Sequence, residues 1–291
     1  MRILLVLSLI FVGLSGCETK KKEEPKYRKF SKKNRKKTNL KTKLKNKSVS
    51  LTTIDFPYSV NGKEHFGTVS YFNPIKKKLP GVLIIPEYWG LTFDMKKKAH
   101  KLAQEKYVVM VADIYGDQKS TSNPDEAQKW LNNFTNDQPK SFETILAAYN
   151  QLKNRKDVDS TKIAIIGYSF GGAFATEMLR RGYDFKAVVN VHGSVGSERR
   201  AKPGFVKAPI LWIKGANDTY IPSKMVSTFE EEMKKAKADL KVITYPNTYS
   251  GFSNPLATKI GQKFQLPIQY NPQKEAAAYR SIVKFLKRKM R

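Results

Sequence analysis

The chain has 291 residues, 40% of them hydrophobic and only one a cysteine, so it can form one large globular core but no internal disulfide. Its 54 basic residues outnumber its 25 acidic residues, and the formal net charge is +29 at pH 7. Because the net charge is this large, each basic segment is a candidate binding site for nucleic acid or for an anionic membrane.

The first residues have the pattern of a bacterial secretory leader. An apolar run from Ile3 to Val12 follows one positive residue, is too short to span a bilayer, and ends in small residues before Cys17. Leu-Ser-Gly-Cys at 14–17 resembles a bacterial lipobox, in which the cysteine is lipidated after cleavage. We therefore expect a signal peptide over residues 1–16 and a lipid anchor on Cys17, in a membrane-anchored lipoprotein of the cell envelope, periplasmic or surface-exposed. The alternative is an uncleaved apolar N-terminus.

Residues 17–50 are expected to form a disordered basic tether behind that anchor. Residues 18–50 hold 15 basic and 3 acidic side chains and almost no large apolar ones, so like charges repel and little can be buried. Three interpretations remain: a solvated spacer, which the even spread of charge elsewhere favours; attraction to anionic lipid headgroups; and nucleic-acid binding, which no aromatic interleaving supports.

Residues 51–291 alternate strand and helix patterns. A hairpin over 50–72 turns at Asn61-Gly62. Apolar strands are expected at 82–86, 107–112, 163–166, 185–191, 209–213 and 241–245, and helices at 95–105, 124–134, 141–155, 173–179, 223–237 and 272–290. This alternation predicts one α/β domain, a mostly parallel sheet with helices on both faces, and a site at the carboxyl ends of the strands.

One segment carries the clearest chemical signal. An apolar strand from Ile163 to Ile166 runs into Gly167-Tyr168-Ser169-Phe170-Gly171 and then into a helical pattern. This strand–turn–helix context around Gly-x-Ser-x-Gly is that of a nucleophile elbow, which exposes the serine hydroxyl at the sheet edge. An ordinary βα turn is the alternative. A serine nucleophile needs a base oriented by an acid, and Asp218 follows a later strand in the expected chain order.

From about Thr52 to the C-terminus the chain resembles the dienelactone hydrolase family. The matching segments, in order, are 85–91, 112–116, 167–172, 191–193, 214–222 and 245–255. The resemblance implies an α/β-hydrolase fold and hydrolysis of a small ester or lactone through an acyl-enzyme, with no metal and no cofactor. It makes Ser169 the nucleophile, Asp218 the acid, the Tyr88 and Phe170 N–H groups the oxyanion hole, and Glu87 the contact of the resting nucleophile.

This chain lacks a histidine at the position of the family's catalytic histidine. It lies two residues before a phenylalanine, and in this chain Ser250 stands there, before Phe252. A serine hydroxyl cannot accept a proton near pH 7 as imidazole does. Of the three histidines, His65 and His100 are expected to be structural. His192 follows the strand beside the elbow and is the remaining candidate for a substitute base, although its Gly-flanked pattern is typical of a pocket wall.

The substrate is also expected to differ from the family's. In dienelactone hydrolases proper two arginines bind the substrate carboxylate, and here Asp117 and Asn254 occupy those positions. Five aromatic residues indicate an apolar pocket: Tyr88, Trp89, Tyr115, Tyr168 and Phe170. The sequence thus supports two hypotheses, an ester or lactone hydrolase with impaired or altered catalysis, and a non-catalytic envelope lipoprotein that binds a ligand or partner in a vestigial pocket. It does not indicate an oligomeric state.

Overall fold

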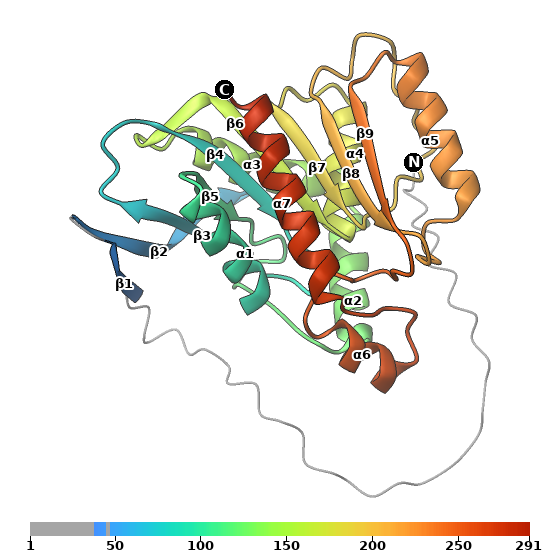
Figure 1. Ribbon diagram of the computed structural model, residues 1–291, viewed down its shortest axis with the longest axis horizontal. Coiled ribbons are helices and arrows are strands. Elements are labelled where there is room, and N and C mark those ends of the chain that lie inside the picture. Colours follow the sequence, from blue (N-terminus) through green and yellow to red (C-terminus); the bar gives the residue numbers. More distant parts are fainter. Residues whose placement is uncertain (1–37, 45–46) are drawn as a thin grey trace, which may run out of the picture.

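The computed structural model describes residues 38–44 and 47–291, with side chains from Ser50 onward. Within these residues nine strands form one sheet in the order β1-β2-β3-β5-β4-β6-β7-β8-β9 (Figure 1). The strands from β5 to β9 pair in parallel, whereas β1, β2 and β3 pair antiparallel. Their bounds are β1 Thr38–Leu44, β2 Lys47–Val60, β3 Lys63–Asn73, β4 Leu79–Ile85, β5 Val108–Val111, β6 Val158–Tyr168, β7 Ala187–Val191, β8 Ile210–Gly215 and β9 Leu240–Tyr245.

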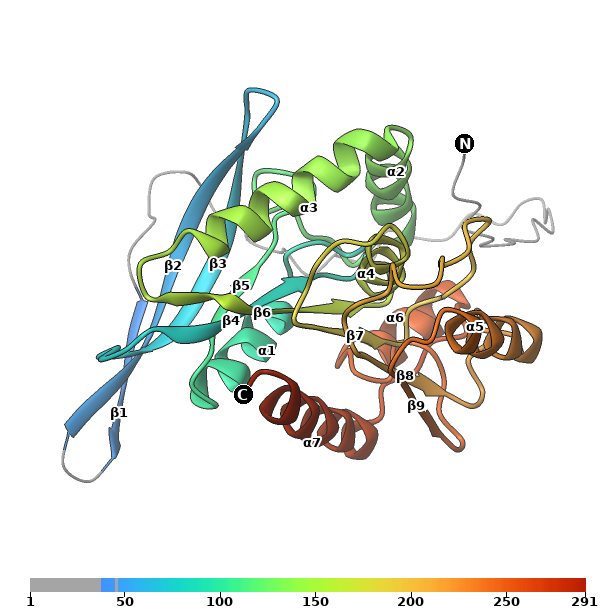
Figure 2. The ribbon, with the colours of Figure 1, turned by 90° about the horizontal axis from the view of Figure 1, so that it is seen from above.

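Helices cover both faces of the parallel part of the sheet (Figure 2). Helices α1 and α7 lie on one face, and α3, α4 and α5 on the other, as their buried side chains in two separate core clusters show. The helix bounds are α1 Phe93–Gln104, α2 Pro124–Thr135, α3 Gln138–Lys153, α4 Phe170–Arg180, α5 Ser223–Lys235, α6 Ala257–Phe264 and α7 Pro272–Lys289.

The central strand β4 shows why the sheet must be covered on both sides. Its residues are apolar in succession, and because neighbouring side chains point to opposite faces, Leu83 and Ile85 enter the core under α3 and α4. Val82 and Ile84 enter the core under α1 and α7. All four are fully buried, so β4 is held in the middle of the sheet and its carboxyl end at the centre of the site.

The sequence-based expectations for the domain are confirmed in class and order. The parallel sheet, the hairpin over β2 and β3 with its turn at Asn61-Gly62, and the six expected helices are all present. Helix α6 was not expected. It is short, and its buried residues Ala257, Ile260 and Gly261 are too few to give a clear period in the sequence.

The tether prediction was wrong for residues 38–44 and 47–50. These residues form β1 and the start of β2, and they pair antiparallel. In Thr38–Leu44, Thr and Leu alternate with Asn and Lys, a strand pattern, and lysines are common on edge strands because they discourage further pairing. The predicted signal peptide 1–16, Cys17 and the tether up to residue 37 lie outside the described residues. Among the described residues no helix is long and apolar enough to cross a membrane.

Candidate active site

Three neighbouring strands bring the predicted site residues to one edge of the sheet. Strand β6 pairs with β4 so that Gly167 lies beside Ile85, and with β7 so that Tyr168 lies beside Val191. Continuing each register places Ser169 between residue 87 on one side and residue 192 on the other. Glu87 and His192 therefore flank the predicted nucleophile, one from each adjacent strand.

Ser169 has the strained backbone of a nucleophile elbow. Its φ is 50° and its ψ is −116°, a conformation that a residue with a side chain rarely adopts and that costs on the order of 1–3 kcal/mol. The tight turn needs glycine at Gly171, where an added Cβ would lie 2.2 Å from the Ile85 carbonyl oxygen. The same close approach presses the first turn of α4 onto the end of β4.

That approach brings together the two predicted oxyanion-hole residues, Tyr88 after β4 and Phe170 at the start of α4. Both line the cavity described below. Within the described part of the chain neither backbone N–H donates a hydrogen bond, whereas the N–H groups of the next helical residues, Gly172 and Ala173, bond to the Ser169 carbonyl oxygen. The helix N-terminus adds partial positive charge, so the arrangement suits a developing oxyanion.

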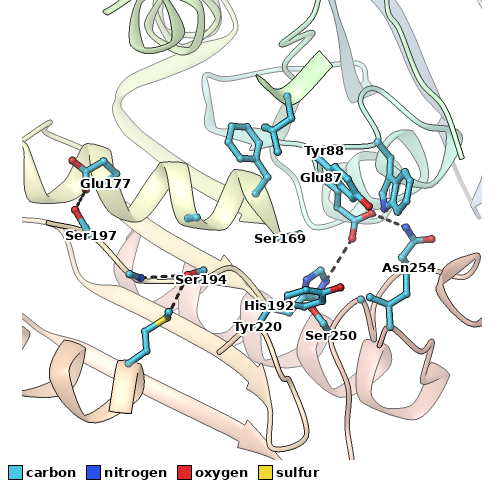
Figure 3. Close-up of a pocket in the computed structure, with 18 of the residues that line it drawn as sticks. Glu87, Tyr88, Ser169, Glu177, His192, Ser194, Ser197, Tyr220, Ser250 and Asn254 are labelled. Atoms are coloured by element: carbon cyan, nitrogen blue, oxygen red, sulfur yellow. Dashed lines mark hydrogen bonds and ion pairs between the residues drawn. The ribbon is translucent and has the colours of Figure 1, made fainter. Parts of the chain in front are cut away.

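A cavity of about 350 Å³ opens beside Ser169. Figure 3 shows Glu87, His192, Ser250 and Asn254 at one end of it and Glu177 and Ser197 at the other. The lining is largely apolar and includes Leu131, Met225, Leu266 and Ile268. Of the five aromatic residues expected there, Tyr88, Trp89 and Phe170 line the cavity. Tyr115 and Tyr168 do not, and both are packed into the core instead.

Glu87 is a buried carboxylate at the catalytic end of the cavity. One oxygen, Oε2, accepts a hydrogen bond of 2.7 Å from the Asn254 side-chain amide, and the other, Oε1, lies 3.7 Å from His192 Nε2. Burial raises the pKa of Glu87 to about 7, while the nearby Lys98 charge and the Asn254 hydrogen bond oppose the rise. Glu87 therefore exchanges a proton in the pH range where a general base operates.

His192 is held in a way that does not favour the role of substitute base. Its Nε2 lies 2.8 Å from the Ser253 hydroxyl, and its Nδ1 has no hydrogen-bond partner among the described residues. Burial, helped by the positive charge of Lys98, lowers the pKa of His192 to about 3. The imidazole is neutral at pH 7 and a weak base. The Ser169 hydroxyl forms no hydrogen bond to any described residue.

Asp218 and Ser250, the expected acid and the expected position of the base, lie together, and the Ser250 hydroxyl interacts with the Asp218 carboxylate. Their loops are packed tightly, since the Asn217 N–H donates to the Thr248 carbonyl oxygen at 2.9 Å. Burial raises the pKa of Asp218 to about 6, and the Ser250 hydroxyl and the Tyr220 N–H lower it. Ser250 lines the cavity, whereas Asp218 does not, and Asp218 Oδ2 has no hydrogen bond of ordinary geometry among the described residues.

Of the remaining sequence-based candidates, Asn254 lines the cavity, whereas His65, His100 and Asp117 do not. His65 bonds through Nδ1 to the Asp113 carbonyl oxygen, and His100 bonds to the Thr53 hydroxyl, so both have structural partners as expected. Asp117 is exposed and does not line the cavity, while Asn254 does. Within the described residues no cluster of three or more His, Cys, Asp or Glu side chains could hold a metal.

Sequence reasoning missed two sets of residues around the site. Behind His192, the buried Lys98 donates to the Ser253 carbonyl oxygen at 2.7 Å and to Glu275 at 3.2 Å. At the far end of the cavity, Glu177 is surrounded by arginines. The i,i+3 and i,i+4 spacing of Glu177 with Arg180 and Arg181 was visible in the sequence, but the contacts of Arg199 with Glu177 and of Lys98 with Glu275 join distant segments and arise only through the fold.

Known proteins agree with this architecture. The chain is 27% identical over 180 residues to "Protein usf" of Aquifex pyrophilus, covering 60% of this chain and 77% of that protein. It is 26% identical over 179 residues to "Probable 2-oxo-3-(5-oxofuran-2-ylidene)propanoate lactonase" of Bradyrhizobium sp, covering 58% and 71%. The crystal structure of a dienelactone hydrolase-like promiscuous phosphotriesterase, P91, from metagenomic libraries shares the fold, with a TM-score of 0.77, 24% identity, and 83% and 99% coverage.

The family assignment rests on most of the domain. The model of the dienelactone hydrolase family matches residues 68–290, which include the elbow, Asp218 and Ser250. The match starts inside β3 and ends in the last residues after α7, so it spans the whole parallel sheet. The chain belongs to the dienelactone hydrolase family, whose members are hydrolases of the lactone and ester type.

Proposed function

We propose that the protein hydrolyses a small ester or lactone with Ser169 as nucleophile, and that its catalysis is altered because Ser250 replaces the family's histidine. The observation that carries the proposal is the placement of Ser169. It sits on a strained elbow at the wall of a 350 Å³ cavity, beside two N–H groups that have no partner in the described chain. Such a site can bind an acyl group and stabilise an oxyanion.

In this proposal Glu87 takes the place of the missing base. Among the groups lining the catalytic end, its carboxylate has a pKa of about 7, against about 3 for His192. Ser169 Oγ bonds to the acyl carbon, and its proton passes to Glu87. The ester C–O bond breaks, and Glu87 returns the proton to the leaving alkoxide. Water then hydrolyses the acyl-enzyme by the same transfer.

The first test is the Ser169→Ala substitution in the domain, assayed with p-nitrophenyl acetate and butyrate. Because the substitution removes the nucleophile and no acyl-enzyme can form, we expect kcat/KM to fall at least about tenfold. Ser227→Ala, an exposed serine on α5 away from the cavity, is the matched control and should keep full activity. Equal rates for the wild type and Ser169→Ala would exclude hydrolysis at the elbow.

That outcome would favour the second candidate function, a ligand-binding lipoprotein without catalysis. The specific observation in its favour is the pairing of Asp218 with Ser250, since an acid that orients no imidazole cannot complete a triad. The cavity itself would remain able to bind a small molecule of partly apolar character.

We also propose that the protein is anchored to a membrane of the cell envelope through Cys17. The support is in the sequence, where the lipobox-like Leu-Ser-Gly-Cys at 14–17 is followed by a strongly basic segment. In bacteria grown with a labelled fatty acid, the wild type should take up the label and fractionate with membranes. Cys17→Ser should take up none and lose membrane association. Labelling that survives Cys17→Ser would contradict the anchor.

A further inference from the structure

The basic residues of the domain gather at the end of the sheet opposite Ser169. The parallel strands β4 to β9 all begin at this end, and the connections that lead into them are 74–78, 106–107, 155–157, 182–186, 203–209 and 237–239. Together with residue 291, which follows α7, these connections hold ten basic and three acidic side chains. We name this surface the basic edge.

The end of the sheet that carries Ser169 has the opposite balance. The connections that follow the same strands are 86–92, 112–123, 169, 192–202, 216–222 and 246–256, and they hold four basic and five acidic side chains. The positive charge of the folded domain is therefore distributed unevenly, whereas the sequence suggested an even spread. A general preference for lysine would make both ends basic, so it does not explain the difference.

Hydrogen bonds and ion pairs show that the connections of the basic edge lie side by side. A 2.9 Å bond from the Leu79 N–H to the Asp157 carbonyl oxygen joins the connections before β4 and β6, and a 2.8 Å backbone bond from Ile210 joins those before β8 and β9. The end of α7 lies there too, since Lys287 Nζ is 2.6 Å from Glu105 Oε2, and Figure 1 shows the C-terminus far from α6. Six strand starts spaced by about 4.8 Å make this surface about 24 Å wide.

Most of the positive charge at the basic edge has no acidic neighbour. Two of the three acidic residues are already paired, Asp157 with Arg155 at 2.5 Å and Asp239 with Lys289. The other nine basic residues are all exposed and form no ion pair with any described residue. Like charges held this close repel one another, and an external anionic surface would relieve the repulsion.

The helix dipoles do not account for this charge. Basic side chains in the last turns of α3, α5 and α7 are favourable because the carbonyl end of a helix is partly negative. Several lysines of the basic edge are more than a turn away from any helix end in the chain: Lys76, Lys77, Lys78, Lys186 and Lys207. The last turns of the helices therefore add to the charge of the basic edge without explaining it.

We propose that the basic edge docks onto a membrane surface of anionic lipid headgroups, so that Ser169 faces away from the bilayer. The inference rests on the proposed Cys17 anchor only for the presence of a membrane nearby. About 20 residues separate Cys17 from Thr38, and an extended chain of that length spans at most about 70 Å, so an anchored domain can reach the headgroups. Each basic residue near an anionic membrane adds to the binding.

The composition of the basic edge fits a lipid surface better than a nucleic acid. Eight of its ten basic residues are lysines, which act as point charges, whereas nucleic-acid binding relies largely on arginine forks and stacked aromatic rings. Phe205 is the only one of its large apolar side chains that is strongly exposed, at 47%. One exposed ring can enter the headgroup region of a bilayer, but it offers a single base only one stacking surface.

This orientation places the proposed hydrolase site on the aqueous side of the domain. The Lys186 N–H donates to the Ile163 carbonyl oxygen at 2.9 Å, which puts Ile163 at the basic edge. Ser169 follows six residues later along β6, so at about 3.3 Å per residue it lies roughly 20 Å from the headgroups. A substrate would therefore reach Ser169 from the water and not from within the bilayer.

Vesicle binding tests the surface without the lipid anchor. The protein is the chain from residue 17 onward with Cys17→Ser, which holds every described residue and omits only the predicted leader. The edge variant replaces four exposed lysines of the basic edge: Lys76→Gln, Lys77→Gln, Lys186→Gln and Lys207→Gln. The matched control loses the same charge at four exposed lysines elsewhere: Lys97→Gln, Lys119→Gln, Lys259→Gln and Lys263→Gln.

The two variants should differ in their affinity for anionic vesicles. With about 30% phosphatidylglycerol in phosphatidylcholine, we expect the edge variant to bind at least about tenfold more weakly than the control, because four headgroup contacts are lost. The basic segment before β1 is the same in both variants, so it cannot produce the difference. Equal binding of the edge variant and the control would overturn the proposal.

A fluorescent label reports which end of the sheet faces the lipid. Cys17 is the only cysteine, so in the Cys17→Ser chain a label attaches only at an introduced site, Lys207→Cys at the basic edge or Lys259→Cys on α6. A quencher attached to the lipid headgroups should quench the label at 207 strongly and leave the label at 259 nearly unchanged. Equal quenching at the two sites would contradict the orientation.

A short duplex DNA tests the competing occupant with the same two variants. If the edge variant loses affinity for DNA but binds vesicles as tightly as the control, the basic edge is a nucleic-acid site and the membrane proposal is wrong. These measurements need neither hydrolysis nor lipidation of Cys17. An inactive Ser169 or an unlabelled Cys17 would therefore contradict the proposed function and leave the result for the basic edge unchanged.

Discussion

Ser250→His is expected to raise the esterase kcat/KM by about 10² or more, because in the proposed function Ser250 stands where an imidazole base is missing and the substitution supplies one. A positioned general base contributes typically 10²–10⁴ to the rate. The site already holds what the imidazole needs. Ser250 faces the cavity beside Asp218, and Asp218 Oδ2 has no other hydrogen-bond partner in the described chain, so it can accept a hydrogen bond from the ring N–H and orient the imidazole. The measurement is kcat/KM for p-nitrophenyl butyrate.

Three further variants identify the source of the gain. Ser250→Gln introduces a side chain of similar size without a base and should leave the rate within about threefold of the wild type. Ser250→His combined with Ser169→Ala should return to the buffer rate, and Ser250→His combined with Asp218→Asn should lose most of the gain, because the ring is no longer oriented. If Ser250→His and Ser250→Gln have equal rates, the position does not present a base to Ser169.

The sequence predicted the site best where a short motif lies next to a buried strand or helix. The elbow at Ser169 could be predicted because Gly167 and Gly171 are needed for the close passage of strand and helix, and the apolar runs on either side mark a buried strand and a buried helix. The placement of Glu87 and His192 beside Ser169 follows from the same logic, since residues at the carboxyl ends of adjacent parallel strands meet at one edge.

The other features of the site depend on contacts between residues that are far apart in the chain, and such contacts produce no pattern in the sequence. Glu177 and Arg199 meet through an irregular loop after β7, and the Asn254 hydrogen bond to Glu87 joins residues 167 positions apart. The high density of basic residues led to the prediction of a disordered tether over residues 38–44. The alternation of Thr and Leu with Asn and Lys there indicated a strand instead. Aromatic residues near the site were also ambiguous, since Tyr115 and Tyr168 turned inward to the core.

Glu87→Gln is expected to abolish most of the activity and at the same time to stabilise the protein above neutral pH. If Glu87 accepts the Ser169 proton, wild-type kcat/KM should rise with pH around a midpoint near 7, the pKa of Glu87. Gln cannot accept that proton, so the rate should fall by about 10² and the remaining activity should lack this midpoint. The measurement is kcat/KM for p-nitrophenyl acetate from pH 5.5 to 8.5.

The effect on stability has the opposite sign. Burial raises the pKa of Glu87 from 4.5 in the unfolded chain to about 7, so the neutral acid contributes stability that is complete below pH 4.5 and is lost as the pH rises through 7. The ionised form costs at most about 3 kcal/mol at pH 8. Gln stays neutral, and its amide oxygen can still accept from Asn254. The unfolding free energy of Glu87→Gln should therefore match the wild type at pH 4.5 and exceed it at pH 8.

A second buried acid and a second variant make this prediction specific to Glu87. Burial also raises the pKa of Asp218, to about 6, so part of the wild-type loss of stability with pH belongs to Asp218 and should persist in Glu87→Gln. Ser169→Ala should lose activity but keep the full pH dependence of stability, since it leaves both carboxyls in place. A flat activity profile from pH 5.5 to 8.5, or full activity in Glu87→Gln, would show that another group takes the proton. The paired loss of rate and gain of stability in Glu87→Gln would mean that the protein keeps a destabilising buried carboxylate for its chemistry.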